Sequence, residues 1–184
     1  GVFYYDYDGY QDYDTINISQ VIRNKDASVR GGELEISSSP LDGLLVSLGV
    51  SALDATVKDV ALPSGRIADR EMPQAPSLSV TGLLRKEWQV ARGYLAIQGD
   101  FKYAGERYFR SINHPAYREG AYTVGNARVS FGPASRRWEI AAFAKNVTDT
   151  TYRVFGYEDL GVNGVINDNY GPPRWMGIVG SLKW

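Results

Sequence analysis

Three arginines and several aromatic residues lie close together in one polar stretch of the chain, and their chemistry suits a ligand. This stretch contains Arg107, Tyr108, Arg110, His114, Tyr117 and Arg118. Guanidinium groups bind anions through charge-assisted hydrogen bonds, and aromatic rings attract cations and cover apolar faces of ligands. These residue types therefore favour a site that binds an anionic chelate or the face of a sugar. For any single residue the alternative is a loop that is solvated or that contacts lipopolysaccharide.

Residue patterns typical of enzymes or metal centres do not emerge from the sequence. An acidic run is formed by Asp6, Asp8, Asp12 and Asp14. It lacks the Gly-x5-Glu frame of a calcium-binding EF-hand, and we predict that it belongs to a solvated wall of strands. His114 is the one histidine, and no carboxylate or thiol motif accompanies it. The Glu33 and Glu35 pair is expected on any polar strand face, so we predict no enzyme activity, no catalytic residue, no metal site and no cofactor.

The composition points to strands. The 184 residues include 20 Gly, 13 Tyr and 4 Trp but no Cys, and the net charge is −1. No stretch of about 18 apolar residues is present, which argues against a transmembrane helix. A membrane protein built from strands passes this test, because polar residues facing a lumen alternate with apolar residues facing lipid. No cluster of Lys and Arg marks a surface for nucleic acid, so we expect no nucleic-acid partner.

Alternation of apolar and polar residues recurs along the whole chain and predicts an all-β, antiparallel fold. We expect about eight strands, at roughly 1–12, 28–38, 43–55, 77–88, 93–104, 121–132, 137–149 and 174–184. Short turns at about 38–43, 89–92 and 132–137 alternate with long connections at about 56–76, 105–120 and 150–173. Short turns at one end and long loops at the other are the layout of a transmembrane β-barrel.

The aromatic residues agree with a membrane barrel. Four of them are expected on the apolar face near the short-turn end, as a membrane girdle: Trp88, Phe131, Trp138 and Trp184. Tyrosines are predicted to gather at the other end: Tyr103, Tyr108, Tyr117, Tyr122, Tyr152 and Tyr157. Two belts of amphipathic rings are typical of the two membrane interfaces. Trp175 departs from the pattern, because its parity places it on the lumen face.

Several segments resemble the C-terminal barrel region of TonB-dependent receptors. Residues 3–11 and 27–35, the latter with the sequence ASVRGGELE, are similar to two strands of that family. Residues 145–152, KNVTDTTY, resemble its Asn-x-Thr/Phe-Asp-x-x-Tyr segment, and residues 172–184 are similar to its closing strand. Trp184 replaces the Phe with which that strand usually ends.

The resemblance implies that residues 1–184 are the C-terminal part of a barrel of about 22 strands. The plug domain and the earlier strands would lie upstream, because the chain begins inside an expected strand. By resemblance, the cell outer membrane of a Gram-negative bacterium is the location. The surrounding partners would be membrane lipid and lipopolysaccharide. The barrel-assembly machinery would recognise Trp184 as the assembly signal, and TonB–ExbB–ExbD would act through the plug.

The function implied is receptor-mediated, TonB-energised uptake of a scarce nutrient. An iron–siderophore complex, a cobalamin or an oligosaccharide is the expected small-molecule ligand. Two other classes stay open from the sequence. One is an independent eight-stranded outer-membrane barrel with a structural or adhesive role. The other is a soluble carbohydrate-binding β domain.

Overall fold

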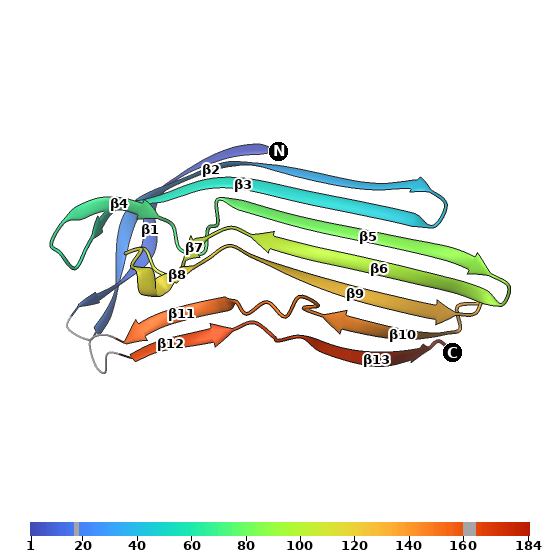
Figure 1. Cartoon of the computed structure of the whole chain (residues 1–184). Helices are drawn as coiled ribbons and strands as arrows, with labels where there is room; N and C mark the ends of the chain where they lie inside the picture. The colour runs from blue at the N-terminus through green and yellow to red at the C-terminus, as the bar shows by residue number, and fades with distance from the viewer. Residues whose placement is uncertain (17–18, 160–164) are drawn as a thin grey trace.

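The main feature of the fold is a single antiparallel sheet in which strands next to each other in sequence are also neighbours in space (Figure 1). The computed structural model describes residues 1–16, 19–159 and 165–184. The sheet runs through β1 (Val2–Ile16), β2 (Ser19–Leu41), β3 (Leu44–Ala61), β5 (Leu78–Val90), β6 (Gly93–Ala104), β9 (Tyr122–Gly132), β10 (Trp138–Lys145) and β13 (Trp175–Leu182). All eight predicted strands are confirmed.

Cross-strand register sorts the side chains onto two chemically different faces. Trp88 pairs with Leu95, which pairs with Phe131, so an apolar row crosses three strands. Farther along the same strands, Arg85 pairs with Gln98 and Gln98 with Arg128, which gives a polar row on the other face. The apolar face is open: Leu84 is 55% and Ile178 is 79% exposed. A continuous apolar surface of this kind is unusual for a protein surrounded by water.

Two aromatic side chains cover glycines on neighbouring strands within the sheet. A Cβ atom on Gly82 would lie 2.3 Å from Cε1 of Phe101, and one on Gly177 would lie 2.8 Å from Cζ of Phe143. The missing side chain lets the ring lie flat against the neighbouring backbone. Phe143 also makes an edge-on contact with Trp175, with ring centroids 4.9 Å apart. This contact puts Trp175 on the polar face, as its parity predicts.

The two ends of the sheet differ in construction (Figure 1). Tight connections join β2 to β3, β5 to β6 and β9 to β10 at one end, which we call the turn end. In the first of these turns Gly43 has φ +68°, and a Cβ there would lie 2.3 Å from the carbonyl oxygen of Glu87. Only glycine meets both demands without strain. The other end carries the long connections and is called the loop end.

Within the long connections the structure contains further elements that the alternation did not predict. They are β4 (Ile67–Glu71), β7 (Arg107–Tyr108), the 3-10 turn η1 (Pro115–Tyr117), β8 (Arg118–Glu119), β11 (Arg153–Asp159) and β12 (Val165–Tyr170). The strands β1, β2 and β3 also extend farther towards the loop end than predicted. In β3 a register shift between Val57 and Val60 interrupts the two-residue period, so the extension does not show a regular alternation of apolar and polar residues.

The small hydrophobic core lies at the loop end rather than behind the sheet. Ala27, Val57 and Val60 are fully buried there, and Met72 and Ile112 pack against them. This cluster joins β2 and β3 to segments of two long connections. No helix in the described part of the chain is long and apolar enough to cross a membrane.

Candidate ligand-binding surface

The segment at 105–120 is folded back on itself, and its candidate residues have different surroundings. Arg107 in β7 is buried, and its Nη2 donates to the carbonyl oxygen of Arg153 at 3.0 Å and to the Tyr122 hydroxyl at 3.3 Å. Its guanidinium carbon also lies 5.1 Å from the centroid of the Tyr122 ring. These contacts join the segment at 105–120 to β9 and β11, so Arg107 has a structural role in this structure.

The 3-10 turn η1 holds two further candidates. His114 precedes the turn, and its Nδ1 accepts a hydrogen bond from the backbone N–H of Ala116 at 3.2 Å. This side chain therefore caps a turn that Pro115 begins, as expected for an ordinary loop residue. Tyr117 ends the turn and is only 4% exposed. It is therefore available to a ligand only if the loop moves.

Arg118 and Tyr108 pair across the short β7–β8 ladder. The exposed guanidinium of Arg118 forms an ion pair with Glu106. The hydrogen bond from Arg118 holds the pKa of Glu106 below its ordinary value, against a smaller opposing effect of burial. The carbonyl oxygen of Tyr108 accepts a hydrogen bond from the backbone N–H of Gln74 at 2.8 Å. Through these contacts the segment is fixed to the β3–β5 connection.

Arg110 is the candidate that faces a pocket. Its guanidinium carbon lies 5.8 Å from the Tyr117 ring centroid, and Nη2 is 3.5 Å from the carbonyl oxygen of Tyr13. The pocket has a volume of about 440 Å³ and is lined by Arg110 with Tyr10, Tyr13, Phe109 and Phe155 among others. Tyr10 and Tyr13 come from β1 and Phe155 from β11, so spacing along the chain does not predict that these rings meet Arg110.

Arg153 is a central residue of the loop end that the sequence did not reveal. Its side chain donates to Glu119 at 2.9 Å, to Asp168 at 3.1 Å and to the carbonyl oxygen of Ala116 at 3.1 Å. Burial alone would lower its pKa, but the hydrogen bonds and charges of Glu119 and Asp168 outweigh burial and raise the pKa. Arg153 thus ties the β11–β12 hairpin to the segment at 105–120.

One acidic residue is not solvated, and here the sequence interpretation was wrong. Asp12 is 6% exposed and accepts a hydrogen bond from Lys25 at 2.9 Å. The hydroxyl of Ser111 also donates to the same carboxylate oxygen, Oδ2. Asp12 and Lys25 come from the β1–β2 hairpin, whereas Ser111 comes from the segment at 105–120. A buried charge needs such partners, because desolvation without them is costly.

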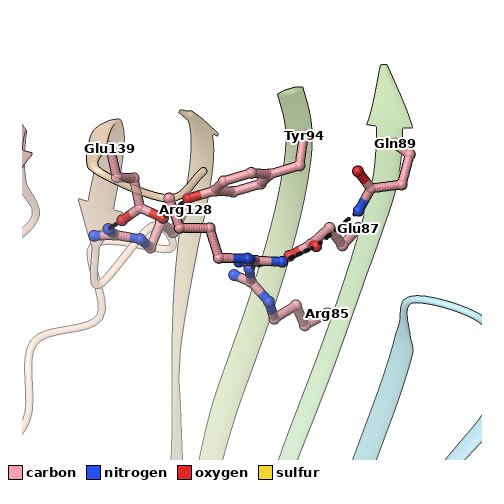
Figure 2. Close-up of polar contacts among 7 residues, drawn as sticks. Arg85, Glu87, Gln89, Tyr94, Arg128 and Glu139 are labelled. Carbon is pink, nitrogen blue, oxygen red and sulfur yellow. Dashed lines mark hydrogen bonds and ion pairs between the residues drawn. The ribbon is translucent and has the colours of Figure 1, made fainter. Parts of the chain in front are cut away.

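The turn end carries a second polar cluster, on the polar face of the sheet (Figure 2). This face lines a broad hollow and is called the concave face. Glu139 accepts hydrogen bonds from the Tyr94 hydroxyl at 2.7 Å and from Arg128 at 2.5 Å. Glu87 accepts from Arg85 at 3.0 Å and pairs with Arg136, whose guanidinium carbon is 4.4 Å from the Tyr94 ring centroid. The cluster spans β5, β6, β9, β10 and the β9–β10 turn, and both of its carboxylates pair with arginines of the cluster.

Three of the four predicted girdle residues, Trp88, Phe131 and Trp138, lie near the tight turns on the apolar face. Trp88, Phe131 and Trp138 are all partly exposed, and the Phe131 and Trp138 ring centroids are 5.8 Å apart. Trp184 lies two residues beyond the end of β13 and is fully exposed. Their girdle role, and the assembly signal at Trp184, stay predictions.

The predicted tyrosines lie at the loop end, but several of them do not form a belt on the apolar face. Tyr122 stacks on Tyr152 with ring centroids 4.5 Å apart, and both line the concave side instead of the apolar face. Tyr117 is buried. The side chain of Tyr157 lies outside the described residues. Among the described residues, no three His, Asp or Glu side chains cluster closely enough to hold a metal ion.

Comparison with known proteins identifies the architecture. Residues 1–147 match the family described as TonB dependent receptor-like, beta-barrel. The chain belongs to this family. TonB-dependent receptors are transporters of the Gram-negative outer membrane and not enzymes. The exposed apolar face therefore faces lipid and the concave polar face faces the lumen. The turn end is periplasmic and the loop end extracellular, as in other outer-membrane barrels.

Solved TonB-dependent receptors share the fold. The chain is 20% identical to the ferric yersiniabactin uptake receptor FyuA of Yersinia pestis, with a TM-score of 0.73 over 87% of this chain and 24% of that one. It is 18% identical to the ferric-catecholate import receptor Fiu of E. coli K12, with a TM-score of 0.69 over 97% and 24%. For the copper transporter OprC the values are 14% identity, a TM-score of 0.66, and 97% and 27%. The chain thus spans about a quarter of each receptor.

Proposed function

We propose that this chain forms the C-terminal part of the barrel wall of a TonB-dependent receptor that imports a scarce nutrient as a metal chelate. The observation that carries the proposal is the eight-strand wall, which has a lipid-facing surface and an ordered extracellular loop cluster and belongs to this family. The C-terminal position rests on the resemblance of residues 172–184 to the closing strand of the family.

The choice of a metal chelate has two supports. The similar receptors FyuA and Fiu are described by a ferric complex that they import, and OprC is described as a copper transporter. The loop end of this chain also presents arginines among aromatic rings, a combination that binds anionic groups with apolar surfaces. A cobalamin and an oligosaccharide are the competing ligands.

The proposed partners follow from the same assignment. A plug domain would fill the lumen against the concave face, and TonB–ExbB–ExbD would act through that plug. The barrel-assembly machinery would read the closing strand with Trp184. Lipopolysaccharide would surround the extracellular rim. The six candidate residues of the segment at 105–120 would contribute to ligand binding, Arg110 directly and the buried Arg107 and Tyr117 by holding the loop in shape.

An independent barrel of eight strands is less compatible with the sheet. A closed barrel needs a ladder between its first and last strands, since every backbone group in lipid requires a partner. In the described part of the chain the sheet runs from β1 to β13, and these two strands are not paired with each other. A soluble carbohydrate-binding domain is excluded by the family.

Transport assays with the full-length gene product test the proposal. Cells that carry the gene should accumulate a radiolabelled ferric chelate from a panel of siderophores, and the same cells without TonB should not. Cobalamin and maltooligosaccharides serve as the competing cargos. Uptake that continues without TonB, or recovery of the protein from the soluble fraction without detergent, would overturn the assignment.

A further inference from the structure

The β11–β12 hairpin forms a separate part of the loop end, and we call its described residues, 153–159 and 165–170, the extracellular arm. In the described part of the chain its two strands pair with each other and with no strand of the wall. Figure 1 shows β11 and β12 beyond the ends of β10 and β13. A backbone ladder with the wall therefore does not set the position of the arm, and other contacts must do so.

The base of the arm, residues 146–152 and 171–174, is tied to the wall at β9. Asn146 is 3% exposed, and its Nδ2 donates to the carbonyl oxygens of Thr150 at 2.9 Å and Pro172 at 3.1 Å. Asn146 thus joins the two halves of the base. The backbone N–H of Val147 donates to the carbonyl oxygen of Gly125 in β9 at 2.9 Å. The base is therefore a fixed point from which the arm extends.

Above this base, the guanidinium of Arg153 joins the arm to the segment at 105–120. Its Nε donates to Glu119 at 2.9 Å, and its Nη1 donates to the carbonyl oxygen of Ala116 at 3.1 Å. The same Nη1 donates to Asp168 of the arm at 3.1 Å. Its Nη2 donates to the carbonyl oxygen of Arg118. All three guanidinium nitrogens are engaged, and the acceptors belong to both sides of the junction.

An aromatic contact lies beneath this guanidinium. Phe109 of the segment at 105–120 is 4% exposed, and its ring centroid is 6.2 Å from that of Phe155 in the arm. The guanidinium carbon of Arg153 lies 5.6 Å from the Phe109 centroid. Apolar burial is non-directional, whereas hydrogen bonds need specific distances and angles. Arg153 therefore fixes the orientation in which the arm rests on Phe109.

Two carboxylates on opposite sides of the junction share the charge of Arg153. Glu119 belongs to the segment at 105–120 and Asp168 to the arm, and the three side chains are only 12%, 22% and 17% exposed respectively. Partly buried charges are screened less by solvent and salt than exposed ones. Without the shared cation, the two carboxylates would repel each other across the junction. The same residue thus attracts both sides and suppresses their repulsion.

We propose that Arg153 is a latch that holds the extracellular arm against the segment at 105–120. When the latch is broken, the arm swings away as an intact hairpin while its base stays fixed to β9. Val154 of the arm lines the concave hollow, so this movement changes access to the hollow from the loop end. The inference goes beyond the proposed function, because it concerns a movement of the wall's own loops and not the identity of the cargo.

Distance measurements on the full-length receptor in lipid nanodiscs test the latch. Spin labels are attached to Asp42→Cys in the β2–β3 turn and to Asn169→Cys in the arm, and double electron–electron resonance gives the distance distribution. Arg153→Gln should raise the ratio of released to docked arm at least about tenfold. A distribution identical to that of the unaltered latch would overturn the proposal.

Amide hydrogen exchange separates a moving arm from an unfolded one. In Arg153→Gln the amides of the β11–β12 ladder should keep their protection, because the arm moves as an intact hairpin. Loss of that protection would show that Arg153 merely stabilises the hairpin, and would contradict the latch. Arg153→Lys keeps the positive charge but has fewer N–H donors, so it should release the arm less than Arg153→Gln.

Two further variants test the shared cation. Glu119→Gln combined with Arg153→Gln removes the repulsion from Asp168, so the double variant should release the arm less than Arg153→Gln alone. Equal or greater release in the double variant would contradict this account. Arg118→Gln is the matched control, because this arginine lies in the same segment and its ion pair with Glu106 stays within that segment. It should leave the distance distribution unchanged, and release of the arm in this control would contradict a specific latch.

The outcome is independent of the proposed function. A docked arm in Arg153→Gln, in a receptor that still imports its cargo with TonB, overturns the latch and leaves the transport function standing. A released arm in a receptor without TonB-dependent uptake has the opposite meaning. Heat-modifiable migration on gels verifies that each variant is folded.

Discussion

The loop end and the turn end of this barrel wall both contain clusters of arginine, acidic and aromatic residues, but the two clusters are held together differently. At the turn end, Arg128 and Glu139 belong to adjacent strands, and the register that pairs Phe143 with Arg128 fixes where they meet. At the loop end, Ser111 reaches Asp12 across 99 residues of sequence, and Arg110 reaches Tyr13 across 97. Backbone ladders position the first cluster, whereas side-chain contacts themselves hold the second. The loop end is therefore the part that single substitutions should open.

The largest effect is expected from breaking the buried pair at the loop end. Asp12→Ala removes the carboxylate that pairs with Lys25, and both side chains of this pair are 7% exposed. Removing one partner of a buried ion pair typically costs about 3–5 kcal/mol. Amide hydrogen exchange should report the loss at residues 109–113 and in the β1–β2 hairpin while the wall strands stay protected. Asp12→Asn keeps the shape and a hydrogen-bond acceptor, so this control should lose less protection than Asp12→Ala. Uniform loss of protection in the wall would contradict the local role.

The corresponding change at the turn end should cost less. Glu139→Gln removes the charge opposite Arg128, but Arg128 is a third exposed and the Tyr94 hydroxyl can still donate to the amide oxygen. We expect the free energy of unfolding to fall by about 1.5–3 kcal/mol, the usual range for a hydrogen bond to a charged group. Urea unfolding of the full-length receptor in lipid vesicles measures it. Glu35→Gln, on an exposed residue of the same face, should change little. A larger loss than that of Asp12→Ala would reverse the comparison.

A smaller effect is expected in the middle of the wall. Gly82→Ala places a methyl group against the Phe101 ring, which must swing away from the neighbouring strand. Phe101 is 42% exposed and has room to move, so we expect a cost of about 1 kcal/mol, at the low end for overpacking. Gly120→Ala is the control, because nothing lies within 4 Å of the added atom. The same unfolding assay applies. In a Phe101→Ala background, Gly82→Ala should no longer carry this cost, and a cost that persisted there would contradict the ring contact.

The smallest effect concerns pH and the exposed pair of Glu106 and Arg118. The pKa of Glu106 is lowered in the folded protein, so its contribution to stability is complete above the ordinary value of 4.5 and is lost as pH falls through the folded pKa. Exposure to solvent keeps the contribution small. Limited proteolysis with pepsin tests this, with the cleavage rate of the segment at 105–120 corrected for the pH dependence of pepsin itself. As pH falls from about 5 to about 3, the corrected rate should rise slightly in the wild type. Glu106→Gln should lack that extra acceleration, and an identical profile in both proteins would contradict the pairing.

Sequence alone determined the wall of the barrel. Alternation along a strand has period two, so the apolar set that includes Leu84, Ile97 and Ile178 could be assigned to one face without coordinates. Turn residues such as Gly43 marked the connections, and antiparallel neighbours joined by short turns have little choice of partner. For the same reason the sequence predicts positions near the tight turns for Trp88, Phe131 and Trp138, and their cross-strand register agrees. Local rules suffice where each strand meets the next one in the chain.

Only the tertiary structure decided the loop end. The sequence grouped Arg107, Arg110 and Arg118 by proximity in the chain, but folding buries the first, exposes the third against Glu106 and turns the second towards Tyr10 and Phe155. No periodicity links residue 12 to residue 111, and the register shift between Val57 and Val60 hides the apolar face of that strand extension from a two-residue pattern. The environment of each charge depends on which distant segment packs against it. That packing is a property of the folded chain, and a local pattern does not encode it.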